Sequence, residues 1–165
     1  MDLPKRKPNR LHGFDYSSPG AYFITICTEG KQNILGRIVG GGALDAPQIM
    51  LSHVGHIAER CLLSGNKLRY VHVEKYVIMP NHIHFILMVD EVAPGGTSRA
   101  PSPTNAVVPR FVSTFTRFCH KNADKTIFQQ SYHDHVIRNE QDYLKIWAYI
   151  DNNPAKWKED CFYKE

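Results

Sequence analysis

The stretch PNHIHFILMV, residues 80–89, decides the fold because it has the pattern of one strand with two unlike faces. Successive side chains of a β-strand point to opposite faces, so His82 and His84 share one face. The opposite face is apolar and carries Ile83, Phe85, Leu87 and Val89. We expect the apolar side chains to anchor the strand in a core. The two imidazoles form half of a metal site or lie on a wet face, and their spacing alone leaves both interpretations open.

The segments before and after this strand predict further strands and a first helix. Residues 22–28, 68–77 and 128–137 are expected to be extended, and residues 30–46 to form a loop or hairpin. A helix of about four turns is expected to begin at Pro47. Its apolar face consists of Met50, Val54, Ile57, Ala58, Cys61 and Leu62.

Two more helices are predicted in the C-terminal half. The first has an apolar stripe formed by Val108, Phe111, Val112, Phe115, Phe118 and Cys119. The last helix begins after Asn139, whose side chain can cap it, and ends near Asn153, because Pro154 disfavours helical backbone just before it. Its apolar stripe is Tyr143, Ile146, Trp147 and Ile150.

This order of elements predicts the α+β class, with a largely antiparallel central sheet and helices packed on it. We expect a single domain over residues 1–165. Within it, residues 1–20 are interpreted as a basic N-terminal arm and residues 91–106, rich in Pro, Gly and Ser, as a flexible loop.

Composition narrows the class of protein only moderately. The chain has 165 residues, a formal net charge of +4 and an isoelectric point of about 8.9, which permits an anionic partner without requiring one. Four cysteines without a CxxC pair are expected to be reduced thiols of a cytosolic protein. The chain begins without the apolar stretch of a signal peptide, and no apolar run has the length of a membrane span.

The last helix offers a chemical partner for the two histidines. Tyr149 and Asn153 are four residues apart and therefore share a face, with Lys145 one turn earlier on that face. A tyrosine hydroxyl can attack a phosphodiester if a nearby cation activates it. The structural alternative is an amphipathic Tyr149 with a wet hydroxyl and an Asn153 that only ends the helix.

Several segments together resemble a known family. Residues 79–86, MPNHIHFI, are similar to the signature of the HUH endonucleases, and more narrowly of the IS200-like Y1 transposases. Residues 132–140, YHDHVIRNE, and residues 149–157, YIDNNPAKW, resemble segments of REP-associated tyrosine transposases. The N-terminal RLHGFDYS at 10–17 and GAYFITICT at 20–28 are also similar to that family. The resemblance covers the chain apart from residues 30–46 and 91–106.

This resemblance implies a fold, a reaction and a set of site residues. The fold is a ferredoxin-like sandwich. Tyr149 is the nucleophile that attacks single-stranded, hairpin-forming DNA and leaves a 5′-phosphotyrosine and a free 3′-hydroxyl. His82, His84 and Asn153 hold a divalent cation, Mg²⁺ or Mn²⁺. The protein is expected to be a bacterial cytoplasmic transposase, associated with the nucleoid when bound to DNA, and a homodimer is possible.

Basic residues and competing interpretations complete the expectations. The candidates for DNA contact are Lys5, Arg6, Lys7, Arg10, Arg110, Arg117, Lys121 and Lys145. Tyr143 is a rival nucleophile on the same helix. The first alternative function is a sequence-specific DNA-binding protein of the same fold with weak or no cleavage. The second is a hydrolase that uses metal-bound water, with Glu74 or Asp151 as a carboxylate ligand.

Overall fold

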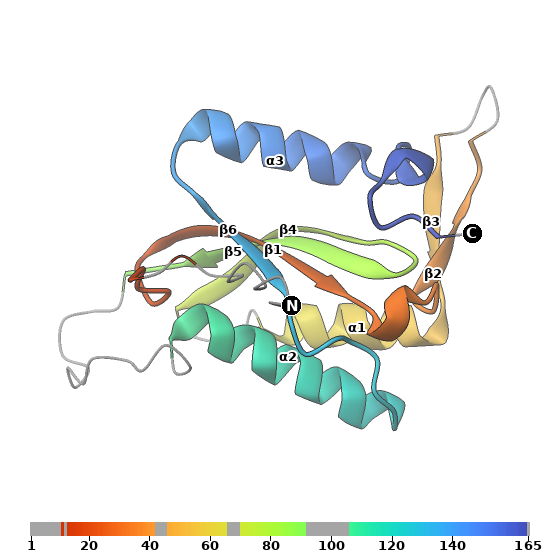
Figure 1. Ribbon diagram of the computed structural model, residues 1–165, viewed down its shortest axis with the longest axis horizontal. Helices are drawn as coiled ribbons and strands as arrows, with labels where there is room; N and C mark the ends of the chain where they lie inside the picture. The colour runs from red at the N-terminus through yellow and green to blue at the C-terminus, as the bar shows by residue number, and fades with distance from the viewer. Residues whose placement is uncertain (1–10, 12, 42–45, 66–69, 92–105, 165) are drawn as a thin grey trace, which may run out of the picture.

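The computed structural model describes residues 11, 13–41, 46–65, 70–91 and 106–164 (Figure 1). Its centre is a four-stranded sheet in the order β4-β5-β1-β6. The strands are β1 Gly20–Cys27, β4 Val71–Ile78, β5 His82–Val89 and β6 His133–Ile137. Every pairing in this sheet is antiparallel. The predicted α+β class with a central antiparallel sheet is therefore confirmed, and β5 is the strand predicted within residues 80–89.

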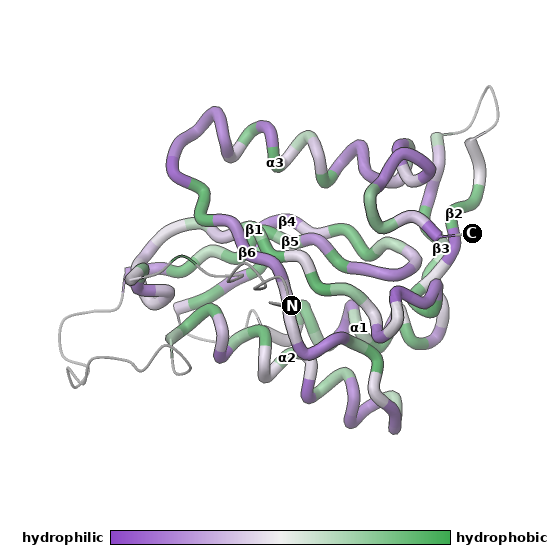
Figure 2. Tube along the Cα trace, in the orientation of Figure 1, coloured by the Kyte–Doolittle hydropathy of each residue, from purple (hydrophilic) through white to green (hydrophobic). Residues whose placement is uncertain are grey.

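Helices cover both faces of this sheet. The helices α1, His53–Ser64, and α2, Val107–Ala123, lie on one face, while α3, Glu140–Asn152, crosses the other (Figure 1). Hydrophobic and hydrophilic residues alternate along α2 and α3, as expected for helices with one buried face (Figure 2). The strand order and the placement of α1 and α2 match the predicted ferredoxin-like sandwich.

The region between β1 and α1 contains a hairpin, one of its two predicted forms, but the helix after it begins later than predicted. A hairpin of β2, Gly36–Val39, and β3, Gln48–Leu51, forms a separate two-stranded sheet. The helix predicted from Pro47 begins only at His53, because Ser52 caps it by accepting a hydrogen bond from the Gly55 backbone N–H. Met50 is therefore a half-exposed strand residue and does not belong to the helical stripe.

The face under α1 and α2 holds the larger apolar core. Ile83, Phe85, Leu87 and Val89 of β5 pack there, as predicted. The α2 stripe is also buried, with one exception. Phe118 is 45% exposed, so its predicted place in the core is wrong. It lies at the margin of the stripe, where a small rotation about the helix axis turns a side chain outward.

The opposite face carries a smaller apolar cluster that holds α3 in place. Ile146 and Ile150 of α3 pack with Ile86 of β5, and Tyr143 and Trp147 lie at the margin, which confirms the predicted stripe. Asn139 caps α3 as predicted, because its side chain accepts from the Asp142 backbone N–H at 2.9 Å.

The termini and loops are described only in part. Residues 1–10 and 12 of the expected basic arm, and residues 92–105 of the expected loop, lie outside the described residues. Within the rest of the expected arm, Tyr16 is buried in the larger core. No helix among the described residues is long and apolar enough to cross a membrane.

Candidate functional site

The two histidines of β5 lie side by side beneath α3. In the sheet, His84 pairs with Thr25 of β1 and His82 pairs with Cys27. Their ring centroids are 4.4 Å apart, and the His84 ring lies 5.1 Å from the Tyr149 ring of α3. Both histidines therefore share the face opposite Ile83 and Phe85, as strand alternation predicts. Both are almost fully buried, at 0% and 1% exposure, so the wet-face interpretation is wrong.

Hydrogen bonds orient the His82 ring. Its Nδ1 lies 2.9 Å from Asn81 Oδ1, and the Asn81 amide is itself fixed because its Nδ2 donates to the Phe162 carbonyl at 2.8 Å. His82 Nδ1 must therefore carry the proton, which leaves a lone pair on Nε2. Among the described residues, this buried Nε2 has no hydrogen-bond partner. A buried lone pair without a donor is the arrangement that a metal ligand requires.

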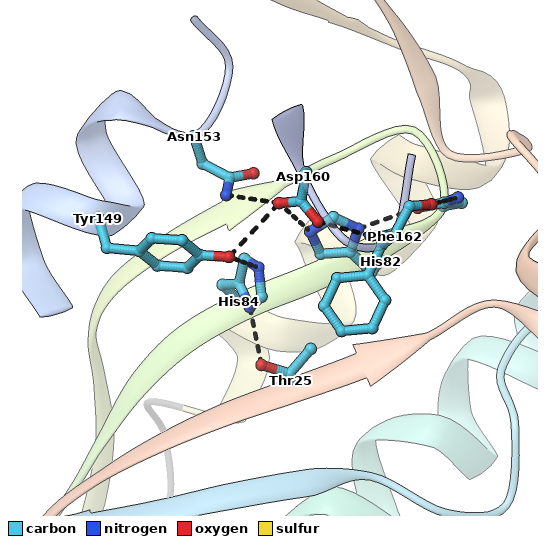
Figure 3. Close-up of polar contacts among 8 residues, drawn as sticks. Thr25, His82, His84, Tyr149, Asn153, Asp160 and Phe162 are labelled. Carbon is cyan, nitrogen blue, oxygen red and sulfur yellow. Dashed lines mark hydrogen bonds and ion pairs between the residues drawn. The ribbon is translucent and has the colours of Figure 1, made fainter. Parts of the chain in front are cut away.

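His84 is oriented in a similar way from β1. Its Nδ1 lies 2.8 Å from the Thr25 hydroxyl, which can accept a hydrogen bond from Nδ1–H. Its Nε2 lies 3.2 Å from the Tyr149 hydroxyl (Figure 3). Each ring is thus held through its Nδ1 atom, His82 by the Asn81 side-chain carbonyl and His84 by the Thr25 hydroxyl. Both Nε2 atoms are left facing the same space.

Tyr149 reaches the histidines from α3 of the same chain. Tyr149 is 41% exposed as a residue, but its hydroxyl points inward, toward His84 Nε2 and toward Asp160 Oδ2 at 3.4 Å (Figure 3). The predicted meeting of the tyrosine with the histidine pair is therefore present within one chain. Tyr143 points elsewhere and packs against Trp147, with ring centroids 5.7 Å apart.

Asn153 also reaches this site, but through its neighbour Asp160. Asn153 Nδ2 donates to Asp160 Oδ2 at 3.0 Å, and among the described residues its buried Oδ1 has no hydrogen-bond partner. Asp160 Oδ2 lies 4.0 Å from His82 Nε2. The ligand atoms of His82, His84 and Asp160 all lie within 4.8 Å of one another, so these three residues could hold a metal ion.

The sequence interpretation missed Asp160. It follows the short 3-10 helix η3, Trp157–Glu159, in a segment without helical or strand periodicity. The Phe162 backbone N–H donates to Asp160 Oδ1 at 2.7 Å and holds the carboxylate over the histidines. The only available signal was the chemical need for an oxygen ligand. The carboxylates considered for that role are elsewhere, since Glu74 pairs with His72 and Asp151 with Lys75.

Burial sets the protonation of the site. Burial lowers the pKa of His82 to about 4, although the charge of Asp160 opposes this shift. Burial, and then the neighbouring His82, lower the pKa of His84 well below its usual value. Both rings are neutral near pH 7, so the contact between His82 and Asp160 is not an ion pair at that pH. Burial, and then the charge of Asp160, raise the pKa of Tyr149 to about 12, so a cation is needed to make the phenolate accessible.

Basic residues differ in their distance from this site. Lys145 lines a cavity of about 510 Å³ beside Tyr149, together with Lys156. Arg110, Arg117 and Lys121 are exposed on helix α2, which covers the other face of the sheet, so the structure does not bring them to the site (Figure 1). Lys5, Arg6, Lys7 and Arg10 lie outside the described residues.

Comparison with known proteins gives a fold relative and a sequence relative. No family model matches the chain. Its structure is similar to that of a REP-associated tyrosine transposase bound to a REP hairpin, with a TM-score of 0.59 and 18% sequence identity over 95% of this chain and 74% of that chain. At that identity, the likeness shows a shared fold. An uncharacterised protein of Haemophilus influenzae is 32% identical over 96% of this chain and 93% of its own length. The chain therefore belongs to the same protein family as this Haemophilus influenzae protein.

Proposed function

We propose that the protein is a metal-dependent transposase-like enzyme that cleaves and rejoins single-stranded DNA, with Tyr149 as its nucleophile. One observation carries the proposal. The Tyr149 hydroxyl lies 3.2 Å from Nε2 of the buried His84, beside a second buried imidazole and a carboxylate. The shared fold supports it, because that relative is a tyrosine transposase bound to a hairpin. The histidines, Asp160 and Tyr149 meet within one chain, so the proposal requires no second copy.

We assign the cation to His82, His84 and Asp160. The lone pair of His82 Nε2, which has no donor among the described residues, supports this assignment. A divalent cation bound there supplies positive charge to the phosphate and to the oxygen that leaves it. Of the two expected ions, this set favours Mn²⁺, because Mg²⁺ prefers oxygen ligands and imidazole binds transition metals more readily.

Asp160, and not Asn153, is assigned as the oxygen ligand. A carboxylate is a stronger ligand for a hard cation than an amide oxygen. The Nδ2 group of Asn153 donates to the same Asp160 oxygen that faces His82, which fixes the direction of that oxygen. Asn153 is then a positioning residue. The role of third ligand, which the resemblance implies for Asn153, is assigned instead to Asp160.

The reaction follows from these contacts. The Tyr149 oxygen attacks the phosphorus, and the bond between phosphorus and the 3′-oxygen breaks. The phenolic proton passes to solvent, and the departing 3′-oxygen takes up one proton from solvent. The phosphotyrosine conserves the phosphodiester energy, so a 3′-hydroxyl can reverse the step and join two strands. Lys145 and Lys156, beside Tyr149, are assigned to the phosphates of the attached strand.

The experiment compares variants on labelled hairpin DNA with single-stranded flanks in the presence of Mn²⁺. Wild type is expected to nick the strand, whereas Tyr149→Phe and His84→Ala are not. Tyr149→Phe removes only the hydroxyl, so it is expected to retain DNA and Mn²⁺ binding. Equal cleavage by Tyr149→Phe and wild type contradicts the nucleophile and favours hydrolysis by metal-bound water. Binding without cleavage by wild type favours the DNA-binding alternative.

The ligand assignment is tested by calorimetric titration with Mn²⁺ in the absence of DNA. Asp160→Asn keeps the shape of the side chain and removes its charge, and we expect it to weaken Mn²⁺ binding by about 100-fold or more. Asn153→Ala is expected to weaken binding by about tenfold, as for loss of an orienting hydrogen bond. A larger effect at Asn153 than at Asp160 contradicts the assignment and restores Asn153 as the ligand.

A further inference from the structure

A second cavity lies beside the site. It has a volume of about 610 Å³ and is bounded by the β2–β3 hairpin on one side and by residues 154–164 on the other. Among the described residues, three basic side chains line it, Arg37, Lys158 and Lys164, with one acidic side chain, Glu159. This volume is typical of a ligand pocket, and its excess positive charge suits an anion.

The second cavity lies on the His82 side of the site. Trp157 lines it, and the Trp157 ring is 5.8 Å from the His82 ring. Glu159 lines both this cavity and the one beside Tyr149, so the two cavities are neighbours. Tyr149 lines only the first cavity. The metal ligands therefore lie between a Tyr149 side and a side formed by Trp157 and the hairpin.

The wall of the second cavity combines aromatic and basic groups. Tyr163 is half-buried there and packs edge-on against Trp157, at 5.3 Å between ring centroids. Lys164 is already engaged, since its Nζ donates to the Gly30 carbonyl at 2.8 Å. Arg37 and Lys158 are both exposed. Basic side chains that follow phosphates, next to aromatic rings on which bases stack, are the usual means of binding single-stranded nucleic acid.

The direction of the reaction decides which DNA segment belongs there. In an in-line displacement, the attacking and leaving oxygens lie on opposite sides of the phosphorus. Tyr149 attacks from the side of the first cavity, so the departing 3′-oxygen lies toward His82 and Trp157. We infer that the second cavity binds the single strand 5′ of the scissile phosphate and retains its 3′-hydroxyl end for rejoining. This inference rests on the proposed function. Arg37 and Lys158 are assigned to its phosphates and Tyr163 to a base.

Binding is tested with the full-length Tyr149→Phe protein, Mn²⁺ and a pool of hairpins with randomised single-stranded flanks. The double variant Arg37→Ala/Lys158→Ala is expected to lose affinity about tenfold for hairpins that carry the 5′ flank. The slope of log affinity against log salt should shrink by about 1.4, which is about 0.7 for each lost phosphate contact. Hairpins without the 5′ flank should bind both proteins equally. The matched control is Arg60→Ala/Lys125→Ala, which removes two exposed basic residues outside both cavities.

Joining is tested with Tyr149 intact. At saturating DNA, the double variant is compared with wild type and with the Arg60→Ala/Lys125→Ala control per amount of covalent adduct formed. It should join an added 3′-hydroxyl strand about tenfold less efficiently. In the binding experiment, the inference is overturned if the Arg37→Ala/Lys158→Ala variant loses affinity equally for hairpins with and without the 5′ flank, or if its salt slope is unchanged.

Photocross-linking separates this inference from the proposed chemistry. With iododeoxyuridine in the 5′ flank, the cross-link is expected at Tyr163 or elsewhere in residues 157–164. If adducts form but the cross-links map outside the second cavity, the cavity assignment alone fails. If no hairpin yields an adduct while the cross-link and the flank effect persist, the proposed chemistry fails and the cavity remains a single-strand site.

Discussion

The two faces of strand β5 are both buried but differ in chemistry. Along β5, Ile83 and Phe85 face α1 and α2 and contribute only apolar atoms to the larger core. His82 and His84 alternate with these residues, face α3 and are as fully buried. The Nε2 atom of His82 nevertheless has no hydrogen-bond donor among the described residues. Burying such a group is unfavourable. The apolar face therefore supplies the stability and rigidity with which the other face can hold a costly polar site.

The largest expected effect comes from breaking the apolar face. Phe85→Ala removes a fully buried ring that packs 6.0 Å from Phe111 and 6.4 Å from Phe115, between centroids. We expect the free energy of unfolding to fall by about 3–5 kcal/mol, measured by urea denaturation. Leu63→Ala, at an exposed position of α1, is the control and should change it by about 0.5 kcal/mol or less. A loss below about 1 kcal/mol at Phe85 contradicts this role of the face.

On the face that carries the histidines, we expect a large loss of metal affinity and only a small loss of stability. His82→Gln keeps a polar side chain but removes the Nε2 ligand. Mn²⁺ affinity should fall by about 100-fold or more, while the free energy of unfolding of the metal-free protein should change by less than about 1.5 kcal/mol. Calorimetry and urea denaturation measure the two quantities. A loss of stability as large as that of Phe85→Ala means that His82 is a core residue and not a ligand.

Strand and helix periodicity predicted much of this comparison. Alternation along residues 82–89 was sufficient to separate the two faces, and helical spacing placed Tyr149, Asn153 and Lys145 on one side of α3. The start of α1 was not predictable in the same way, because Pro47 is as compatible with a hairpin as with a helix. The pairing of β3 with β2 decides between a hairpin and a helix at this position. This pairing is a contact between two segments, so the local sequence pattern does not predict it.

Asp160 could not be predicted for a related reason. Its place is set by backbone hydrogen bonds in an irregular segment and by the long-range contact from Asn81 to the Phe162 carbonyl. Nothing in the spacing between Asp160 and His82 encodes that contact. Residues 154–164 also form one wall of the second cavity. Both Asp160 and this cavity therefore depend on a segment without helical or strand periodicity.

The pH dependence of stability offers a finer test of the buried imidazoles. The pKa of His82 is about 4 in the folded protein and 6.5 when unperturbed, so the unfolded chain binds more protons between these values. Stability of the metal-free protein should therefore be highest above pH 6.5 and fall as the pH decreases toward 4. In urea denaturation across this range, His82→Gln should show a shallower decline than wild type. An equal decline in both proteins contradicts the burial of a neutral His82.

The smallest expected effect concerns the contacts that hold α3 to the sheet. Lys75 of β4 lies over the Trp147 ring, with its Nζ 4.4 Å from the centroid, and pairs with Asp151. Lys75→Met keeps the aliphatic length but loses the charge, and we expect a loss of about 0.5–1.5 kcal/mol in the free energy of unfolding. Lys125→Met, at an exposed position, is the control. A slower adduct rate with unchanged DNA affinity would show that these contacts also place Tyr149.

The proposed reaction requires Tyr149 to bond covalently to DNA when the histidine site holds a divalent cation. Trypsin should release residues 146–156, in which Tyr149 is the only side chain with a hydroxyl group. After incubation with hairpin DNA and Mn²⁺, mass spectrometry is expected to find a nucleotide remnant on this peptide. The remnant should be absent without Mn²⁺ and absent from Tyr149→Phe. Cleaved DNA without any protein-bound remnant, or a remnant on a different peptide such as the one that contains Tyr143, would contradict the account.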